Sequence, residues 1–166
     1  MKKQSRILYR DSRYGFTLSI PRWWSSYIVV RRDKGELNSE YGVHFRFKYK
    51  GKLYEDVMTV VVLPLTYKQW VEQGYEDSPL VFIAEHCGKV FAYYTPEELP
   101  DAFIDPKTQE YDFKKYAIPI KLLKRMVNED APRIARSIRF RAPVRTFRSV
   151  PLRSKKVWPC RCKRRK

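Results

Sequence analysis

Apolar and polar side chains alternate clearly in two places, and both predict strands. In the first, Phe16, Leu18 and Ile20 alternate with polar residues, and a proline follows directly. In the second, residues 43–49 place three aromatic side chains in one apolar row, with His44 in the polar row opposite. A period of two is expected where one face of a strand meets a core and the other meets water. We therefore expect two strands with one buried face each.

The next apolar run has no polar face. Residues 53–63 predict a long strand that returns after a tight turn, and its part from 57 to 63 is apolar on both faces apart from Thr59. A strand of this kind is expected at the centre of a sheet. Helices should therefore cover the sheet on both sides.

A short helix and a second hairpin are expected after this strand. Thr66 is a predicted N-cap, Trp70 and Val71 are predicted on the inner side of the helix, and Gly74 marks its end. Two further strands then flank a turn that contains Cys87 and a glycine.

The last part of the body predicts the main helix. The helix should begin near Pro119, and Asp130 should cap a further turn. Residues 137–140 then predict a short final strand. The apolar positions that share one face of the helix are Ile120, Leu123, Met126 and Val127.

These elements predict an α+β fold, mainly an antiparallel β-sheet flanked by helices. With 43% hydrophobic and 15% aromatic residues, the composition excludes a wholly disordered chain. All 18 acidic residues and 24 of the 35 basic residues lie at or before position 140. We therefore expect one domain over residues 1–140 and a basic, disordered tail without a core over residues 141–166.

Basic residues supply the candidate contacts to phosphates or anionic surfaces. One group is the polar row of the second strand, a positive stripe near Tyr41 and Tyr54, for which an ordinary solvated face is the favoured interpretation. The other group is the tail. The candidates are Arg46, Lys48, Lys50, Lys155, Lys156, Arg161, Lys163, Arg164, Arg165 and Lys166.

Candidate catalytic and metal-binding residues are sparse. Cys160 and Cys162 form a C-x-C pair without the further ligand pair that structural zinc needs. A Cys87–His44 dyad is the remaining nucleophilic arrangement, although His44 is expected at the surface on the wet face. We expect no cofactor, no metal and no enzymatic activity.

The acidic residues of one polar connection are a further candidate. Glu97, Glu98, Asp101 and Asp105 could supply paired carboxylates or ligands for a hard cation. Their spacing does not match a calcium loop, so a solvated loop is the favoured interpretation. The chain also lacks the glycine-rich phosphate loops and the G-x-S-x-G motif.

Two short motifs resemble those of a known family. The opening Tyr14-Gly15-Phe16-Thr17-Leu18-Ser19-Ile20-Pro21-Arg22-Trp23-Trp24 resembles the entry of PsbP/Mog1-like domains, and residues 133–140 resemble their final helix and strand. Small uncharacterised proteins of Gram-positive bacteria share this layout. The resemblance spans about residues 9–140 and implies an α/β/α sandwich with a non-catalytic binding or assembly role. The family's site residues do not carry over, and its members offer no counterpart to the basic tail.

The expected function is therefore that of an accessory or binding domain for a protein or small ligand. Trp23 and Trp24 with Arg22 are the candidate contacts, because consecutive residues of an extended segment can place one indole at the surface. The alternative is binding of nucleic acid or an anionic surface through the tail. No signal peptide or transmembrane segment is evident, which favours the cytoplasm, while the resemblance favours the cell envelope or secretion.

Overall fold

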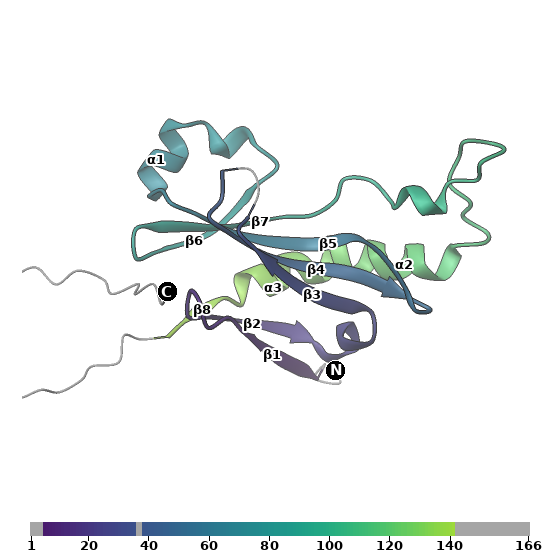
Figure 1. The fold of residues 1–166 in the computed structure, drawn as a ribbon, viewed down its shortest axis with the longest axis horizontal. Coiled ribbons are helices and arrows are strands. Elements are labelled where there is room, and N and C mark those ends of the chain that lie inside the picture. The colour runs from purple at the N-terminus through teal and green to yellow at the C-terminus, as the bar shows by residue number, and fades with distance from the viewer. Residues whose placement is uncertain (1–4, 36–37, 142–166) are drawn as a thin grey trace, which may run out of the picture.

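The computed structural model describes residues 5–35 and 38–141, which form an α+β fold with two mainly antiparallel sheets (Figure 1). The main sheet has the strand order β3-β4-β5-β7-β6 and the small sheet the order β1-β2-β8. The strands are β1 (Arg6–Arg10), β2 (Phe16–Pro21), β3 (Ile28–Asp33), β4 (Tyr41–Tyr49), β5 (Lys52–Leu63), β6 (Val81–His86), β7 (Lys89–Tyr94) and β8 (Arg139–Phe140). The helical segments are η1 (Arg22–Ser26), α1 (Tyr67–Glu72), η2 (Tyr75–Asp77), η3 (Asp101–Phe103), α2 (Ala117–Arg125), η4 (Met126–Asp130) and α3 (Ala131–Arg136).

The larger core lies on one face of the main sheet. Strand β5 is the middle strand, as the unbroken apolar run predicted, and its inner residues pack with the aromatic row of β4. The small sheet and the long helix α2–η4–α3 close this core, and Figure 1 shows that helix running along the sheet. Tyr41 and Tyr54 belong to this core and are buried, so the base-stacking alternative for the basic row of β4 has no exposed tyrosine at either position.

A smaller core covers part of the opposite face, which we call the outer face. Trp70 of α1 packs there on Val61 and Leu63 of β5. Thr66 caps α1 as predicted, since its hydroxyl accepts from the Gln69 amide and the Gln69 side chain accepts from the Thr66 amide. Val71, in contrast, is exposed, so its predicted inner position is wrong.

The long helix contains a π segment, η4, between α2 and α3. Pro132 has no N–H to donate to the carbonyl of Asn128, four residues earlier. A π turn accommodates this gap in the backbone hydrogen bonds of the helix. The Ala131 amide donates instead to the Met126 carbonyl, five residues earlier. Asp130 therefore lies inside a continuous helix, and the prediction that it is an N-cap is wrong.

Asp11 ties the small sheet to the main sheet. Its buried carboxylate accepts from the Tyr41 hydroxyl at 2.6 Å and from the Tyr14 amide at 2.8 Å. The Tyr14 hydroxyl donates in turn to Glu40, and burial together with this hydrogen bond raises the pKa of Tyr14 to about 12. This cluster is internally paired and serves to join the two sheets.

The predicted fold class and the two hairpin turns are confirmed. Lys50 with Gly51, and Cys87 with Gly88, take the positive φ angles that two-residue hairpin loops require. Strand β8 ends the body as predicted, by pairing with β2. The tail from residue 142 onward lies outside the described residues, and the division into body and tail stays a prediction. In the described part of the chain, no helix has the length and apolarity needed to cross a membrane.

Candidate functional site

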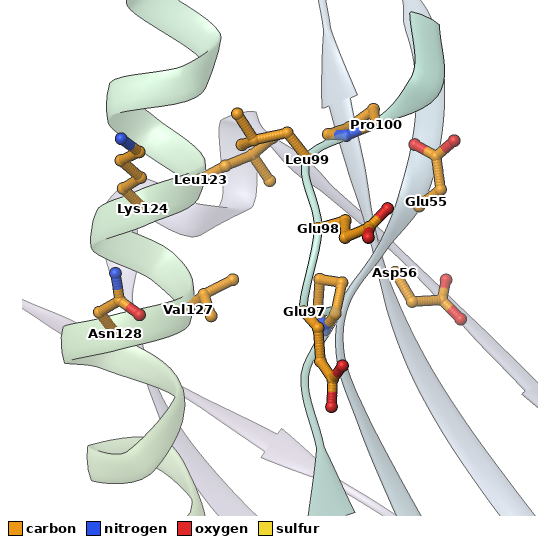
Figure 2. A pocket seen from close by; sticks show the side chains of 11 residues that line it. Glu55, Asp56, Glu97, Glu98, Leu99, Pro100, Leu123, Lys124, Val127 and Asn128 are labelled. Carbon is orange, nitrogen blue, oxygen red and sulfur yellow. The ribbon is translucent and has the colours of Figure 1, made fainter. Parts of the chain in front are cut away.

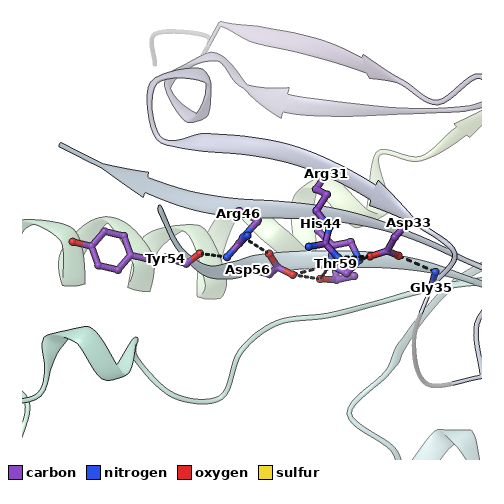
Figure 3. Close-up of polar contacts among 8 residues, drawn as sticks. All are labelled: Arg31, Asp33, Gly35, His44, Arg46, Tyr54, Asp56 and Thr59. Atoms are coloured by element: carbon purple, nitrogen blue, oxygen red, sulfur yellow. Dashed lines mark hydrogen bonds and ion pairs between the residues drawn. The ribbon is translucent and has the colours of Figure 1, made fainter. Parts of the chain in front are cut away.

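The smaller core covers only part of the outer face, and a polar cluster lies on another part of it. Asp33, His44, Asp56 and Thr59, which come from β3, β4 and β5, form what we call the His44 cluster (Figure 3). His44 Nδ1 lies 2.7 Å from Asp56 Oδ2 and 3.3 Å from Thr59 Oγ1. His44 Nε2 lies 3.0 Å from Asp33 Oδ2. The imidazole is thus bracketed by two carboxylates.

The His44 cluster depends on a β-bulge in β5 and on a glycine in β4. Register shifts between β4 and β5 show a bulge beside Val57, so Val57 and Met58 both enter the core. Because of this extra residue, Asp56 faces the same side as Thr59, which regular alternation would forbid. Gly42 leaves space for the side chains of the cluster, because a Cβ at this position would lie 2.8 Å from His44 Nε2 and 2.9 Å from Asp33 Oδ1.

Charges at the cluster are nearly balanced. Arg31 pairs with Asp33 at 3.0 Å, and Arg46 Nε lies 3.5 Å from Asp56 Oδ1. Burial raises the pKa of Asp33, but the Gly35 amide and the Arg31 and His44 side chains outweigh it, so this pKa lies below its ordinary value. His44 Nε2 keeps the ion-pair distance to Asp33 but has no hydrogen bond of good geometry.

The expectation that His44 is a surface residue is wrong. The side chain lies on the face opposite the main core, as the alternation predicted, but only 5% of the residue is exposed because Asp33 and Asp56 enclose it. Thr59, the hydroxyl nearest to the ring, is fully buried and cannot meet a substrate. Cys87 lies at the far end of β7 from Tyr94, the partner of Thr59. Five residues of strand are about 16 Å, which rules out a Cys87–His44 dyad.

An acidic hollow lies on the other side of Glu55 and Asp56, between β5 and the long helix (Figure 2). Its volume is about 200 Å³. Figure 2 shows Leu99 turned toward Leu123 of the helix and Glu98, from the same segment, turned toward β5. The remaining lining residues are Pro96, Glu97, Pro100, Lys124, Val127 and Asn128.

The acidic hollow combines an apolar floor with carboxylates that lack counter-ions. Among the described residues, the side chains of Glu55, Glu97 and Glu98 form no ion pair, whereas Asp56 is shared with the His44 cluster. The amine of Lys124 lies 5.7 Å from the centre of the Phe113 ring. The hollow therefore attracts positive charge next to aliphatic surface.

Two departures from regular geometry meet at the acidic hollow. The bulged part of β5 forms one wall and the π segment η4, with Val127 and Asn128, forms another. Bulges of both kinds are enriched beside functional sites. Sequence reasoning singled out Glu97 and Glu98 but missed Glu55, Asp56 and the helix residues. Pro132 was the available signal for the π segment.

The other acidic residues of that connection do not join the hollow. Asp101 begins η3, and the Asp105 carboxylate accepts from the Lys107 amide. Within residues 5–35 and 38–141, no group of three or more His, Cys, Asp or Glu is placed to hold a metal ion. Cys160 and Cys162 lie outside the described residues.

The tryptophan corner is divided between core and surface. Trp24 is fully buried and donates from Nε1 to Asp130 Oδ2 at 3.0 Å, so its predicted role as a surface contact is wrong. Trp23 is half-buried, and the Arg125 guanidinium lies 4.8 Å from its ring centre. Arg22 is exposed and donates to Ser5. Contact of a partner with Trp23 and Arg22 stays a prediction.

The predicted basic stripe is only partly available. Arg46 is held by Asp56 and by the Tyr54 carbonyl, whereas Lys48 is half-buried and Lys50 is exposed in the turn. The predicted tail contacts, Lys155, Lys156, Arg161, Lys163, Arg164, Arg165 and Lys166, lie outside the described residues.

Comparisons of the chain with protein-family models, with curated proteins and with solved structures found no match.

Proposed function

We propose that the body is a non-enzymatic binding domain for a protein or small ligand, and that its site is the acidic hollow. The ligand group that fits this hollow is a cation on an aliphatic stem. Such a group occurs in a lysine or arginine side chain of a protein and in a small alkylamine. The resemblance to PsbP/Mog1-like domains, itself a proposal, agrees with a non-catalytic role.

One observation carries the proposal: the carboxylates of Glu55, Glu97 and Glu98, which form no ion pair within the described residues, line the same hollow as the apolar side chains of Leu99, Leu123 and Val127. A cationic head placed among these carboxylates gains charge-assisted hydrogen bonds, while its stem covers the apolar floor. Small-ligand sites in proteins have this composition, with mostly apolar walls and a few convergent polar groups.

The His44 cluster supports a binding role rather than catalysis. Both ring nitrogens of His44 face carboxylates, and the adjacent hydroxyl of Thr59 has no access to solvent. A general base needs a free nitrogen within reach of a substrate proton. We infer that the cluster fixes Asp56 and the bulge that shape one wall of the hollow.

The proposal is tested by titrating hexylammonium into the full chain, with hexanoate and hexanol as probes of the same length. Ligand-observed NMR should detect binding of the amine but not of the acid or the alcohol. Glu97→Gln together with Glu98→Gln should weaken binding of the amine about tenfold, because two charge-assisted contacts are lost.

A matched control is the pair Glu72→Gln and Glu76→Gln, which removes two acidic side chains beside the smaller core. This pair should leave hexylammonium binding unchanged. Equal binding of hexylammonium and hexanoate, or equal losses in the two pairs, would contradict the site.

The second candidate function is electrostatic binding of nucleic acid or an anionic surface through the tail, favoured by its eleven basic and no acidic residues. Affinity for an oligonucleotide should then fall steeply with salt, with a log–log slope of about −0.7 to −0.9 for each phosphate contacted. Removing residues 141–166 should flatten this slope. An unchanged slope would assign the affinity to the body.

A further inference from the structure

The outward side of α2 carries exposed apolar residues among cationic ones. Residues 113–125 contain five basic and no acidic residues. Ile118 and Phe113 are exposed by 63% and 55%, the largest values among the large hydrophobic residues of the described chain. We call this region the α2 surface, and its members are Phe113, Lys114, Lys115, Ile118, Lys121, Leu122, Lys124 and Arg125.

The exposed apolar residues are not explained by the core. Pro119, Ile120 and Leu123 are the residues by which α2 packs on the sheet, and all three are buried. Phe113 and Ile118 instead line a hollow on the outside of the helix. Leu122 also lines this hollow, but it is half-buried and packs against the main core. Among the described residues that line the hollow, Glu129 is the single acidic one. Phe113, just before the helix, and Ile118, in its first turn, thus form a short apolar strip that faces solvent.

Cationic side chains lie beside this strip. Lys121, Lys124 and Arg125 line the same hollow, and Lys114 and Lys115 follow Phe113 directly and are exposed. An apolar strip next to lysine and arginine side chains is complementary to an anionic bilayer, whose interface offers phosphates next to acyl chains. A nucleic acid would use the cations but would offer nothing to the aliphatic side chain of Ile118.

We propose that the α2 surface docks on an anionic lipid membrane, with Phe113 and Ile118 entering the interface and the lysines contacting lipid phosphates. The surface and the acidic hollow have different lining residues, and among the described residues Lys124 alone lines both. Docking is therefore independent of the function proposed above, and either can fail alone.

The test uses the full chain and sedimentation with vesicles. Equal mixtures of phosphatidylglycerol and phosphatidylcholine should bind the protein, and pure phosphatidylcholine should bind at least tenfold more weakly. The pair Phe113→Ser and Ile118→Ser should weaken binding to the mixed vesicles about tenfold, because two inserted apolar side chains are lost.

The matched control changes two exposed hydrophobic residues elsewhere, Leu8→Ser and Val81→Ser, which are exposed by 52% and 48%. This pair should bind within twofold of the wild type. Vesicle affinity measured at 0.15 M and 0.5 M salt separates the contribution of the basic tail from that of the apolar strip. Salt screens the charges of the tail but does not prevent insertion of apolar side chains. Phe113→Leu with Ile118→Leu should retain binding, which guards against a loss caused by misfolding.

Three results would overturn the proposal. In the first, the Phe113 and Ile118 serine pair binds vesicles as well as the wild type does. In the second, neutral and mixed vesicles bind equally. In the third, the pair loses affinity for a single-stranded oligonucleotide while vesicle binding is absent, which would assign the surface to nucleic acid.

Discussion

Gly42 is the residue whose missing side chain makes room for the His44 cluster. A Cβ at this position would contact His44 Nε2 and Asp33 Oδ1 at less than 3.0 Å. We expect Gly42→Ala to destabilise the fold by about 1–3 kcal/mol, because the packed ring or carboxylate must shift. Urea unfolding measures the loss.

A double-mutant cycle checks the cause of that loss. In the His44→Ala background the added methyl group meets no imidazole and only the contact with Asp33 Oδ1 remains, so the further cost of Gly42→Ala should be smaller. Equal costs in the two backgrounds would show that the clash with the imidazole does not set the cost of Gly42→Ala.

Asp33 makes the stability of the fold depend on pH. Its pKa is lower in the folded chain than in the unfolded chain, so its ionised form stabilises the fold. That contribution is complete above the unfolded pKa of about 4 and is lost as the pH falls through the folded pKa. The stability gap between the wild type and Asp33→Asn should therefore shrink below pH 4 in urea unfolding. A gap that is constant from pH 7 to pH 2.5 would contradict the ion pairs of Asp33.

At the level of elements, the buried pair of Trp24 and Asp130 joins η1 to the π segment. Trp24→Phe removes the donor to a carboxylate that is itself buried, so we expect a loss of about 2–3 kcal/mol. Asp130→Asn keeps an acceptor oxygen and should cost less. Thermal unfolding of the two variants gives the comparison, and the opposite order would show that this hydrogen bond contributes little.

The N-cap of α1 should contribute less to the stability of the fold than the pair of Trp24 and Asp130 does. Thr66→Ala removes one partner of the capping box and should destabilise the fold by about 1 kcal/mol. Thr66→Ser retains the hydroxyl and should cost much less. Chemical unfolding would contradict the capping role if alanine and serine had equal effects.

The spacing of apolar residues along the chain predicted the strands better than it predicted the candidate site. The alternation in β2 and β4 and the unbroken apolar run of β5 correctly indicated one-sided and central strands, because side-chain burial fixes these patterns. The bulge beside Val57 was not visible, since it depends on pairing with β4. Alternation placed His44 on the correct face but could not show that Asp33 and Asp56 would cover it.

For the whole molecule, the two faces of the main sheet have different roles. The inner face is closed by the small sheet and the long helix, whereas the outer face is closed by α1 over only part of its area. The acidic hollow lies where β5 extends beyond its pairing with β7. The sheet therefore leaves space beside this part of β5, and the bulged backbone determines which side chains line it. The carboxylates that meet there come from β5 and from the segment after β7, which explains why spacing along the chain could not reveal the site.

The most direct test of the proposed binding site is an amide chemical-shift map of the full chain titrated with hexylammonium. The account predicts shifts that gather at residues 55–56, 96–99 and 123–128, with hexanoate producing none there. Shifts confined to other parts of the chain, or an equal response to hexanoate, would contradict it.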